Sequence, residues 1–474
     1  MQLLLLVLIY VAITCVIGFV LTKRSRSSGE FMVAKNQLSL GMLVVLLFGE
    51  IIAASSTTGS AQGGYDQGIS AIWIFAGRGL GALLFVVVLA RFFTEAGKTG
   101  VMSIPEAFGW RFDGKTRILV TIVILIPLML MCSTQVKACA ALLSQMLGVD
   151  VVPLLVAIGV LFGVLACTGL KGIANMNLFH SAVIFFGVLV VTVACVNFVG
   201  GPGALFERVP AEYRDFLYPS AAKIGGDFFS AVLAFAVAVT PANACFSSTD
   251  IRKNGKGLCI AGSLTIVYAF FPVLIGLSAA VALPGADSNS IIYAMPSFVS
   301  PWLGTLIAVA ILAIVLSSAP FLFLSASTIL VRDVFVPVMG NAKTDAWQLR
   351  LSKLLVVPVT VAAILFALNT DSIFSQIIGA AHIKATAAIV LIAGVYWKRL
   401  TNHAAFSALL VSGVLSIVWF FSGDVFGMQI EAFWPALAIS VFLMVVVTLL
   451  DRKHQFEDFE RYRAQWEGEG KSAA

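Results

Sequence analysis

The sequence predicts an all-α protein that crosses a membrane many times. Of its 474 residues, 60% are hydrophobic and only 11% are charged, whereas a soluble domain carries about 25% charged residues. Its apolar runs are long enough to cross a roughly 30 Å hydrocarbon core, which takes about 20 residues of helix. Two of these runs, one in each half of the chain, are interrupted: at residues 49–59 (GEIIAASSTTG) and at residues 240–243 (TPAN).

The two interruptions indicate what such a membrane protein does. Irregular backbone at membrane depth is tolerated only where it is buried in protein or lines a watery cavity. Matching breaks in the two halves of a chain indicate the midplane binding site of a secondary transporter. The sequence therefore predicts a protein that moves a small solute across a membrane.

We expect about 13 transmembrane helices, numbered from zero so that the two broken helices are TM1 and TM6. They cover residues 2–22, 38–60, 70–93, 116–147, 151–169, 175–199, 226–248, 257–283, 300–335, 347–368, 373–397, 402–421 and 431–450.

We expect the first span to be a retained helix and not a signal peptide. Residues 3–21 have no basic segment before them and no small-residue cleavage site after them, and both are features of a signal peptide. Of the 30 Lys and Arg residues, 24 fall on the side that this arrangement assigns to the cytoplasm. The positive-inside rule then places the N-terminus outside and the C-terminus in the cytoplasm of an inner or plasma membrane.

Several function classes are excluded by residue usage. The seven cysteines are odd in number and form no CxxC pair, and the four histidines are scattered, so neither a disulfide framework nor a zinc site is expected. The spans contain no HExxH or GxSxG motif, which argues against an intramembrane enzyme. We expect no organic cofactor, no nucleic-acid partner and no obligate protein partner. The expected partners are a small-molecule solute and the lipid bilayer.

Short motifs in a fixed order resemble the sodium:solute symporter family over about residues 5–400. They are FMVA at 31–34, Gly59 with GYDQG at 64–68, SIPE at 103–106 with RF at 111–112, SS at 317–318 with SAST at 325–328 and RD at 332–333, and GVYWKR at 394–399. Each motif alone is weak, but their order and spacing together are specific.

The resemblance implies a LeuT-type fold of two inverted five-helix repeats, with one extra helix before them and two after. The expected divisions are an extra helix and cytoplasmic loop (1–37), the first repeat with TM1–5 (38–199), an extracytoplasmic loop (200–225), the second repeat with TM6–10 (226–397), two C-terminal helices (398–450) and a cytoplasmic tail (451–474). It also implies that uphill solute entry is coupled to sodium entry.

The resemblance further implies a sodium site made of neutral oxygens. Its ligands would be the carbonyls of Gly49 and Ile52 on TM1 and of Ile314 on TM8, with the hydroxyls of Ser317 and Ser318. Sequence alone leaves another reading open, because serines in apolar helices commonly bond back to a carbonyl one turn earlier.

One sodium per cycle is expected. Some family members hold a second sodium with an aspartate on TM5, and Asn177 stands at that place here. An amide in place of the acid argues against the second ion.

Four ionisable residues lie inside the predicted spans: Glu50, Arg78, Lys137 and Lys384. Each costs at least about 2.5–3.5 kcal/mol at a helix centre, so each is a candidate functional residue. Three positive charges against one negative charge favour an anionic solute, with Arg78 and Lys137 as substrate-binding candidates. The alternatives are that Arg78 binds helix carbonyls and that Lys137 extends its amine to the membrane surface.

Polar residues at the two breaks complete the predicted solute site. Ser55, Ser56 and Thr57 follow the break in TM1, next to a half-helix N-terminus that favours anions. Asn243 follows Pro241 at the break in TM6 and offers an amide contact.

The sequence thus predicts sodium-coupled symport, by alternating access, of a small organic anion such as a carboxylate or an acidic sugar. One rival keeps the fold and is proton-coupled or uncoupled, with an intramembrane lysine in place of sodium and Glu50 or His180 titrating. A rival from another class is a membrane sensor that binds solute without transporting it. The short tail and the lack of any signalling domain count against a sensor.

Overall fold

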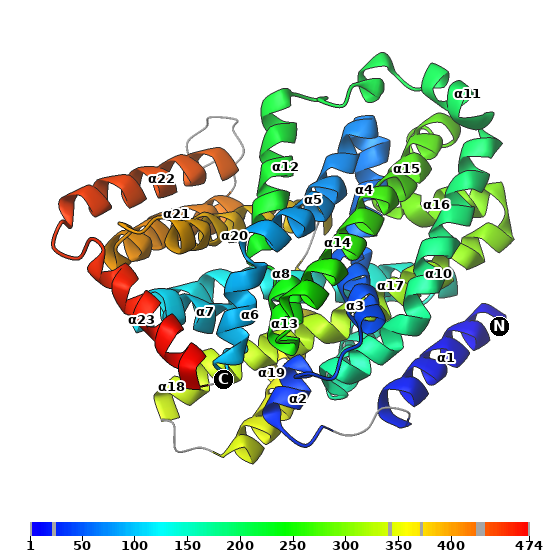
Figure 1. Cartoon of the computed structure of the whole chain (residues 1–474). Helices are drawn as coiled ribbons and strands as arrows, with labels where there is room; N and C mark the ends of the chain where they lie inside the picture. The colour runs from blue at the N-terminus through cyan, green and yellow to red at the C-terminus, as the bar shows by residue number, and fades with distance from the viewer. Residues whose placement is uncertain (1, 21–24, 340–343, 370–372, 423–431, 473–474) are drawn as a thin grey trace.

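The computed structural model describes residues 2–20, 25–339, 344–369, 373–422 and 432–472 (Figure 1). Within these ranges the chain forms helices joined by turns and loops, and no strand. The helices are α1 (Gln2–Cys15), α2 (Ser28–Val33), α3 (Leu40–Ile52), α4 (Ala54–Gln67), α5 (Ile72–Val88), α6 (Ala90–Lys98), α7 (Ile104–Arg111), α8 (Gly114–Leu147), α9 (Val151–Ala166), α10 (Gly169–Phe198), α11 (Gly201–Arg208), α12 (Ala221–Ala236), α13 (Val239–Ser247), α14 (Ile251–Tyr268), α15 (Phe270–Ala282), α16 (Ile291–Val299), α17 (Pro301–Ile329), α18 (Val336–Met339), α19 (Asp345–Leu368), α20 (Ile373–Tyr396), α21 (Asn402–Ser422), α22 (Phe433–Leu450) and α23 (Glu457–Ser472).

Ten helical segments in the described ranges are long and apolar enough to cross a membrane. Three shorter apolar helices, Leu6–Val20, Leu40–Ile52 and Val151–Ala166, add to them. The protein is therefore a multi-pass membrane protein, as predicted. The number of thirteen crossings stays a prediction.

Both expected breaks are present. The first separates α3 from α4 at Ala53, whose φ of 20° is outside the helical range. The second separates α12 from α13 at Val237 and Ala238, a few residues before the predicted TPAN segment. The shift has a physical reason: Pro241 lies in the first turn of α13, where its missing N–H has no helical partner to lose.

The two halves of the first broken helix pack on different neighbours. α3 contacts α14, α10 and α17, whereas α4 packs closely along α15. The α4–α15 contact depends on glycine, because a methyl group at Gly64 would lie 2.5 Å from the carbonyl oxygen of Val273. α17 runs through the middle of the bundle, with 89% of its most apolar stretch buried. Polar groups on α17 therefore face protein and not lipid.

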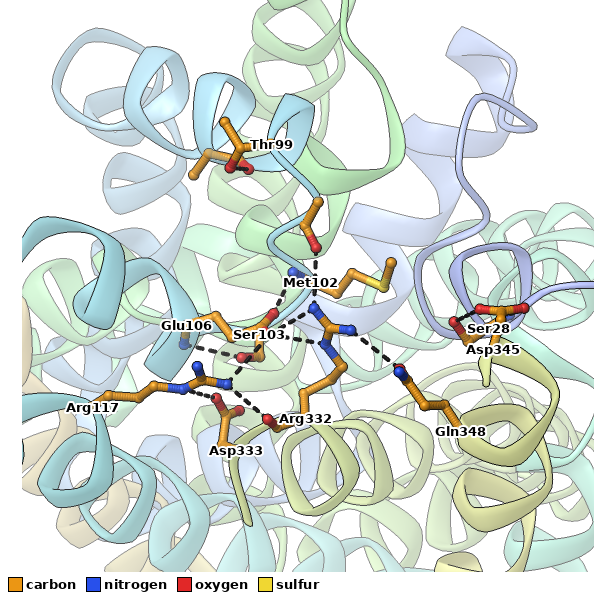
Figure 2. Close-up of polar contacts among 12 residues, drawn as sticks. Ser28, Thr99, Met102, Ser103, Glu106, Arg117, Arg332, Asp333, Asp345 and Gln348 are labelled. Atoms are coloured by element: carbon orange, nitrogen blue, oxygen red, sulfur yellow. Dashed lines mark hydrogen bonds and ion pairs between the residues drawn. The ribbon is translucent and has the colours of Figure 1, made fainter. Parts of the chain in front are cut away.

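Figure 2 shows a network of ion pairs and hydrogen bonds between helices that are far apart in the sequence. Arg117 on α8 pairs with Asp333 at 2.9 Å and with Glu106 on α7 at 3.3 Å. Arg332 pairs with the same Glu106 oxygen at 2.7 Å and donates to Gln348 on α19 at 3.1 Å. Because Arg332 and Asp333 belong to the π-helical turn after α17, the network ties the end of the central helix to α7, α8 and α19.

Candidate functional site

The five residues proposed as sodium ligands lie on α3 and α17, which contact each other in the core. The Gly49 carbonyl oxygen is 3.4 Å from the hydroxyl of Ser317. The hydroxyls of Ser317 and Ser318 both donate to the carbonyl oxygen of Ile314, at 2.7 and 2.9 Å. Four neutral oxygens from two helices therefore gather at one point.

Ile52 is the last residue of α3, so its carbonyl lies at the helix break. It accepts a hydrogen bond from the hydroxyl of Thr57 at 3.2 Å. Ser318 also accepts a hydrogen bond from the amide of Gln135 on α8, at 3.0 Å. The carbonyl and hydroxyl oxygens of these residues are uncharged, and hard cations prefer oxygen ligands.

A further amide lies beside this oxygen cluster. A methyl group at Gly49 would lie 3.1 Å from the amide nitrogen of Asn177 and 3.2 Å from the Ser317 hydroxyl. Asn177 is fully buried, and its amide nitrogen and oxygen have no hydrogen-bond partner within the described part of the chain. Asn177 thus brings a buried amide without a hydrogen-bond partner among the described residues next to Gly49 and Ser317.

A small cavity of about 50 Å³ lies next to the break in the first broken helix. It is lined by Glu50, Ile51, Arg78, Met131, Ala231, Ala234, Phe235, Ala238, Thr240, Ile377, Ala381 and Lys384. Glu50 comes from α3, Arg78 from α5 and Lys384 from α20. Three of the four ionisable residues predicted inside spans therefore surround one cavity.

The three charges in this cavity are not paired with one another. The Arg78 guanidinium donates to the hydroxyl of Ser56 and, at 3.5 Å, to the carbonyl of Ile51. The Lys384 amine contacts the sulfur of Met131 at 3.4 Å. Both carboxylate oxygens of Glu50 are buried without a hydrogen-bond partner among the described residues. The cavity thus offers two cations and one carboxyl group to a ligand.

Thr57, Asn243 and Lys137, also predicted at the solute site, do not line this cavity. The Thr57 hydroxyl lies 3.2 Å from the hydroxyl of Tyr268. Asn243 donates to Ser325 on α17 at 3.4 Å. Lys137 is half-buried on α8 and does not line the cavity, and the side chain of Ser55 lies outside the described residues.

Met131 and Thr240 also line the cavity, although neither was among the predicted solute-binding residues. Thr240 had a local signal, because it directly precedes Pro241 at the second break. Met131 had none: its role depends on where the amine of Lys384, 253 residues later, comes to lie.

A family model and several similar curated proteins were compared with this chain, and both indicate one family. The sodium:solute symporter family model matches residues 31–412. The osmoregulated proline transporter OpuE of Bacillus subtilis is 22% identical over 419 residues, covering 82% of each chain. The sodium/proline symporter of Escherichia coli is 24% identical over 442 residues, covering 87% of this chain and 86% of the relative.

Solved structures share the fold of this chain. A sodium-coupled sialic acid symporter in its substrate-bound, outward-open state superposes with a TM-score of 0.81 at 15% identity, over 95% of this chain and 98% of that chain. MhsT, in complex with L-phenylalanine, superposes with a TM-score of 0.57 at 14% identity, over 87% of this chain and 99% of that chain. The predicted LeuT-type inverted-repeat fold is confirmed. The chain belongs to the sodium:solute symporter family, whose members are sodium-coupled membrane transporters and not enzymes.

Proposed function

We propose that the protein carries a small carboxylate across the membrane together with one sodium ion, by alternating access. The observation that carries the proposal is the cavity in which Glu50, Arg78 and Lys384 meet, directly beside the oxygen cluster of α3 and α17. A solute carboxylate bound there would pair with one of the two cations of the cavity. Solute binding would also affect the position of α3, because α3 supplies both Glu50 and the Gly49 carbonyl.

Arg78 is the proposed anchor for the carboxylate. A guanidinium can hold both carboxylate oxygens at once, which gives geometric specificity as well as energy. Two of its present contacts, to Ser56 and Ile51, are to neutral groups that a carboxylate can replace. The relatives and neighbours fit this class, because proline and sialic acid both carry a carboxylate.

Glu50 favours an amino acid within this class. A buried carboxyl group without partners is costly, and its two oxygens have none among the described residues. The ammonium group of an amino acid would satisfy Glu50 while the carboxylate binds Arg78. A plain organic anion or an acidic sugar would use Arg78 and Lys384 but leave Glu50 without a donor, unless Glu50 is protonated.

The cavity must enlarge for any of these solutes. Its volume of about 50 Å³ is far below the roughly 300–1,000 Å³ of ligand pockets. Its walls come from both broken helices and from α20, and α12 packs along α20. We infer that separation of these helices opens the solute site, which is the movement alternating access requires.

Sodium is proposed to bind the carbonyls of Gly49, Ile52 and Ile314 with the hydroxyls of Ser317 and Ser318. On sodium binding, the two hydroxyls would turn their hydrogens away from the Ile314 carbonyl oxygen, so that this oxygen and the two hydroxyl oxygens can face the ion. The ion would then join α3 to α17 and hold the solute site in shape. Asn177 stands beside this site, and we propose that it supplies an amide oxygen to the same ion and not a second site.

The protein is proposed to lie in an inner or plasma membrane with its N-terminus outside and its C-terminus in the cytoplasm. The support is the distribution of basic residues, with 24 of 30 on one side of the predicted spans. The repeat boundaries 38–199 and 226–397 belong to the same proposal, and they place one break in each repeat.

The test is uptake into liposomes that contain the purified protein. An inward sodium gradient should drive concentrative uptake of at least one member of a panel of L-proline, other amino acids, sialic acid and simple organic acids. A choline gradient of equal strength should not. Uptake driven by a proton gradient in the absence of sodium would support the proton-coupled rival, and solute binding without any uptake would support the sensor.

A further inference from the structure

We propose that His403, Asp451 and His454 form a binding site for a zinc ion, beyond the two predicted repeats. This inference is independent of the transported solute and of the coupling ion. His403 belongs to the first turn of α21, Asp451 ends α22, and His454 lies in the turn that leads to α23. These three residues do not line the solute cavity, and α21 and α22 pack along each other (Figure 1).

Asp451 stands between the two histidines. One of its carboxylate oxygens lies 2.8 Å from Nδ1 of His403, and the other lies 2.7 Å from Nδ1 of His454. The ring centres of the two histidines are 5.2 Å apart, and the ring planes are nearly perpendicular. One nitrogen of each histidine and one carboxylate oxygen of Asp451 therefore lie within 4.8 Å of one another.

The chemistry of these three groups suits zinc. Imidazole nitrogens and carboxylate oxygens bind Zn²⁺ at about 2.0–2.2 Å, and two histidines with one carboxylate leave the fourth position of the ion to water. With such bonds, the ligand atoms of a tetrahedral site lie about 3.4 Å apart, so small rotations of the present side chains would admit an ion. The nitrogen that binds the ion must be unprotonated, so each imidazole would carry its proton on its other ring nitrogen.

The group is open to solvent, but its backbone is held in place. The side chain of His403 is 68% exposed and that of His454 is 32% exposed, so an ion and its bound water can reach them. The hydroxyl of Ser407 donates to the carbonyl of His403 at 2.8 Å. The backbone N–H of Asp451 donates to the carbonyl of Val447 at 2.9 Å. A bound ion would therefore join the start of α21 to the end of α22.

A zinc site is not expected from the sequence, because its four histidines are scattered. The fold brings two of them to one carboxylate, although His403 and Asp451 are 48 residues apart. Two exposed basic residues, Arg452 and Lys453, follow Asp451 and oppose the binding of any cation. An ion bound here must therefore gain from direct bonds to nitrogen, which favours zinc over Ca²⁺ and Mg²⁺, because these prefer oxygen ligands.

The test is a titration of the metal-free, full-length protein, without a polyhistidine tag, with Zn²⁺ in competition with a chromogenic chelator. Every sample carries Cys259→Ser, because the thiol of Cys259 is exposed and thiolate also binds zinc. We expect one saturable zinc ion per chain and little competition from Ca²⁺ or Mg²⁺. His403→Gln and His454→Gln should each weaken binding at least about tenfold, since even the loss of an outer partner of a metal ligand costs 10–100-fold.

Lys453→Gln is the matched control, because Lys453 is exposed in the same turn and is not a proposed ligand. It should not weaken zinc binding, and zinc should raise the unfolding midpoint of this variant but not of the two histidine variants. Undiminished binding in either histidine variant would overturn the proposed ligands. A parent protein without saturable binding, or equal competition by Ca²⁺, would overturn the zinc site and leave a group that only forms hydrogen bonds.

Discussion

Replacing Arg78 by Gln should remove the anchor of the transported carboxylate. The guanidinium lines the solute cavity from α5 and makes its contacts there to the neutral groups of Ser56 and Ile51. Because these partners are neutral, the free protein loses little when the charge is removed. The bound carboxylate, in contrast, would remain in a largely closed cavity without its bidentate donor.

The expected loss can be worked out from this geometry. Truncating one partner of a desolvated, hydrogen-bonded charge pair costs about 2–5 kcal/mol, and every 1.4 kcal/mol is a factor of ten in affinity. Lys384, on the same cavity, keeps one positive charge near the solute and places the loss at the lower end. We therefore expect Arg78→Gln to weaken solute binding by roughly 30- to 300-fold.

The assay is equilibrium binding of the best radiolabelled solute from the uptake panel, in saturating sodium. Lys137→Gln is the matched control, because Lys137 also lies in a predicted span but does not line the cavity. Arg78→Gln should lose affinity while its stabilisation by sodium alone is retained. Wild-type affinity in Arg78→Gln, or an equal loss in Lys137→Gln, would refute the proposed position of the carboxylate.

Three further perturbations follow from the described contacts. Glu50→Gln should cut amino-acid uptake by tenfold or more and leave uptake of a plain organic acid within about threefold of the wild type. The reason is that only the amino acid needs an anionic partner for its ammonium group. Equal effects on both solutes would remove Glu50 from the solute site. Glu106→Gln should destabilise the protein by about 1–3 kcal/mol in thermal unfolding, because it breaks two partly exposed ion pairs to arginines; an unchanged midpoint would show that the network in Figure 2 contributes little. Gly64→Ala should lower the free energy of unfolding by about 1–3 kcal/mol through the clash with Val273. Gly41→Ala is the control and should not, because there is open space around Gly41. Equal unfolding midpoints for the two variants would contradict the close α4–α15 packing.

The fold was largely predictable because its signals are local. Apolar runs of about 20 residues and polar or proline-containing breaks within them depend on the sequence nearby, and both breaks were placed within a few residues. The second break lies slightly earlier than expected, since proline begins a helix more readily than it interrupts one. Sequence could not show that the span containing α17 is the most buried of the ten candidate spans in the described ranges, because this depends on how the other helices pack around it.

The solute site was predictable only in part. The cost of a charge inside a span identified Glu50, Arg78, Lys137 and Lys384 as candidates. Which of them share a cavity depends on contacts between helices far apart in the sequence. The structure brings three together and leaves Lys137 apart, which a view of single helices cannot reveal.

Thermal stability in sodium and in choline tests the central claim most directly. A ligand that binds the native state raises its stability by about 2.7 kcal/mol at one hundred times its Kd. We predict a sodium-specific rise in the unfolding temperature of the wild type, a further rise with the transported carboxylate, and no sodium response in Ser318→Ala. Ser412→Ala is the matched control, because this buried serine makes the same bond to a carbonyl one turn earlier, on α21, and it should keep the wild-type response. Equal stability of the wild type in the two salts, or a full sodium response in Ser318→Ala, would contradict the proposed sodium site.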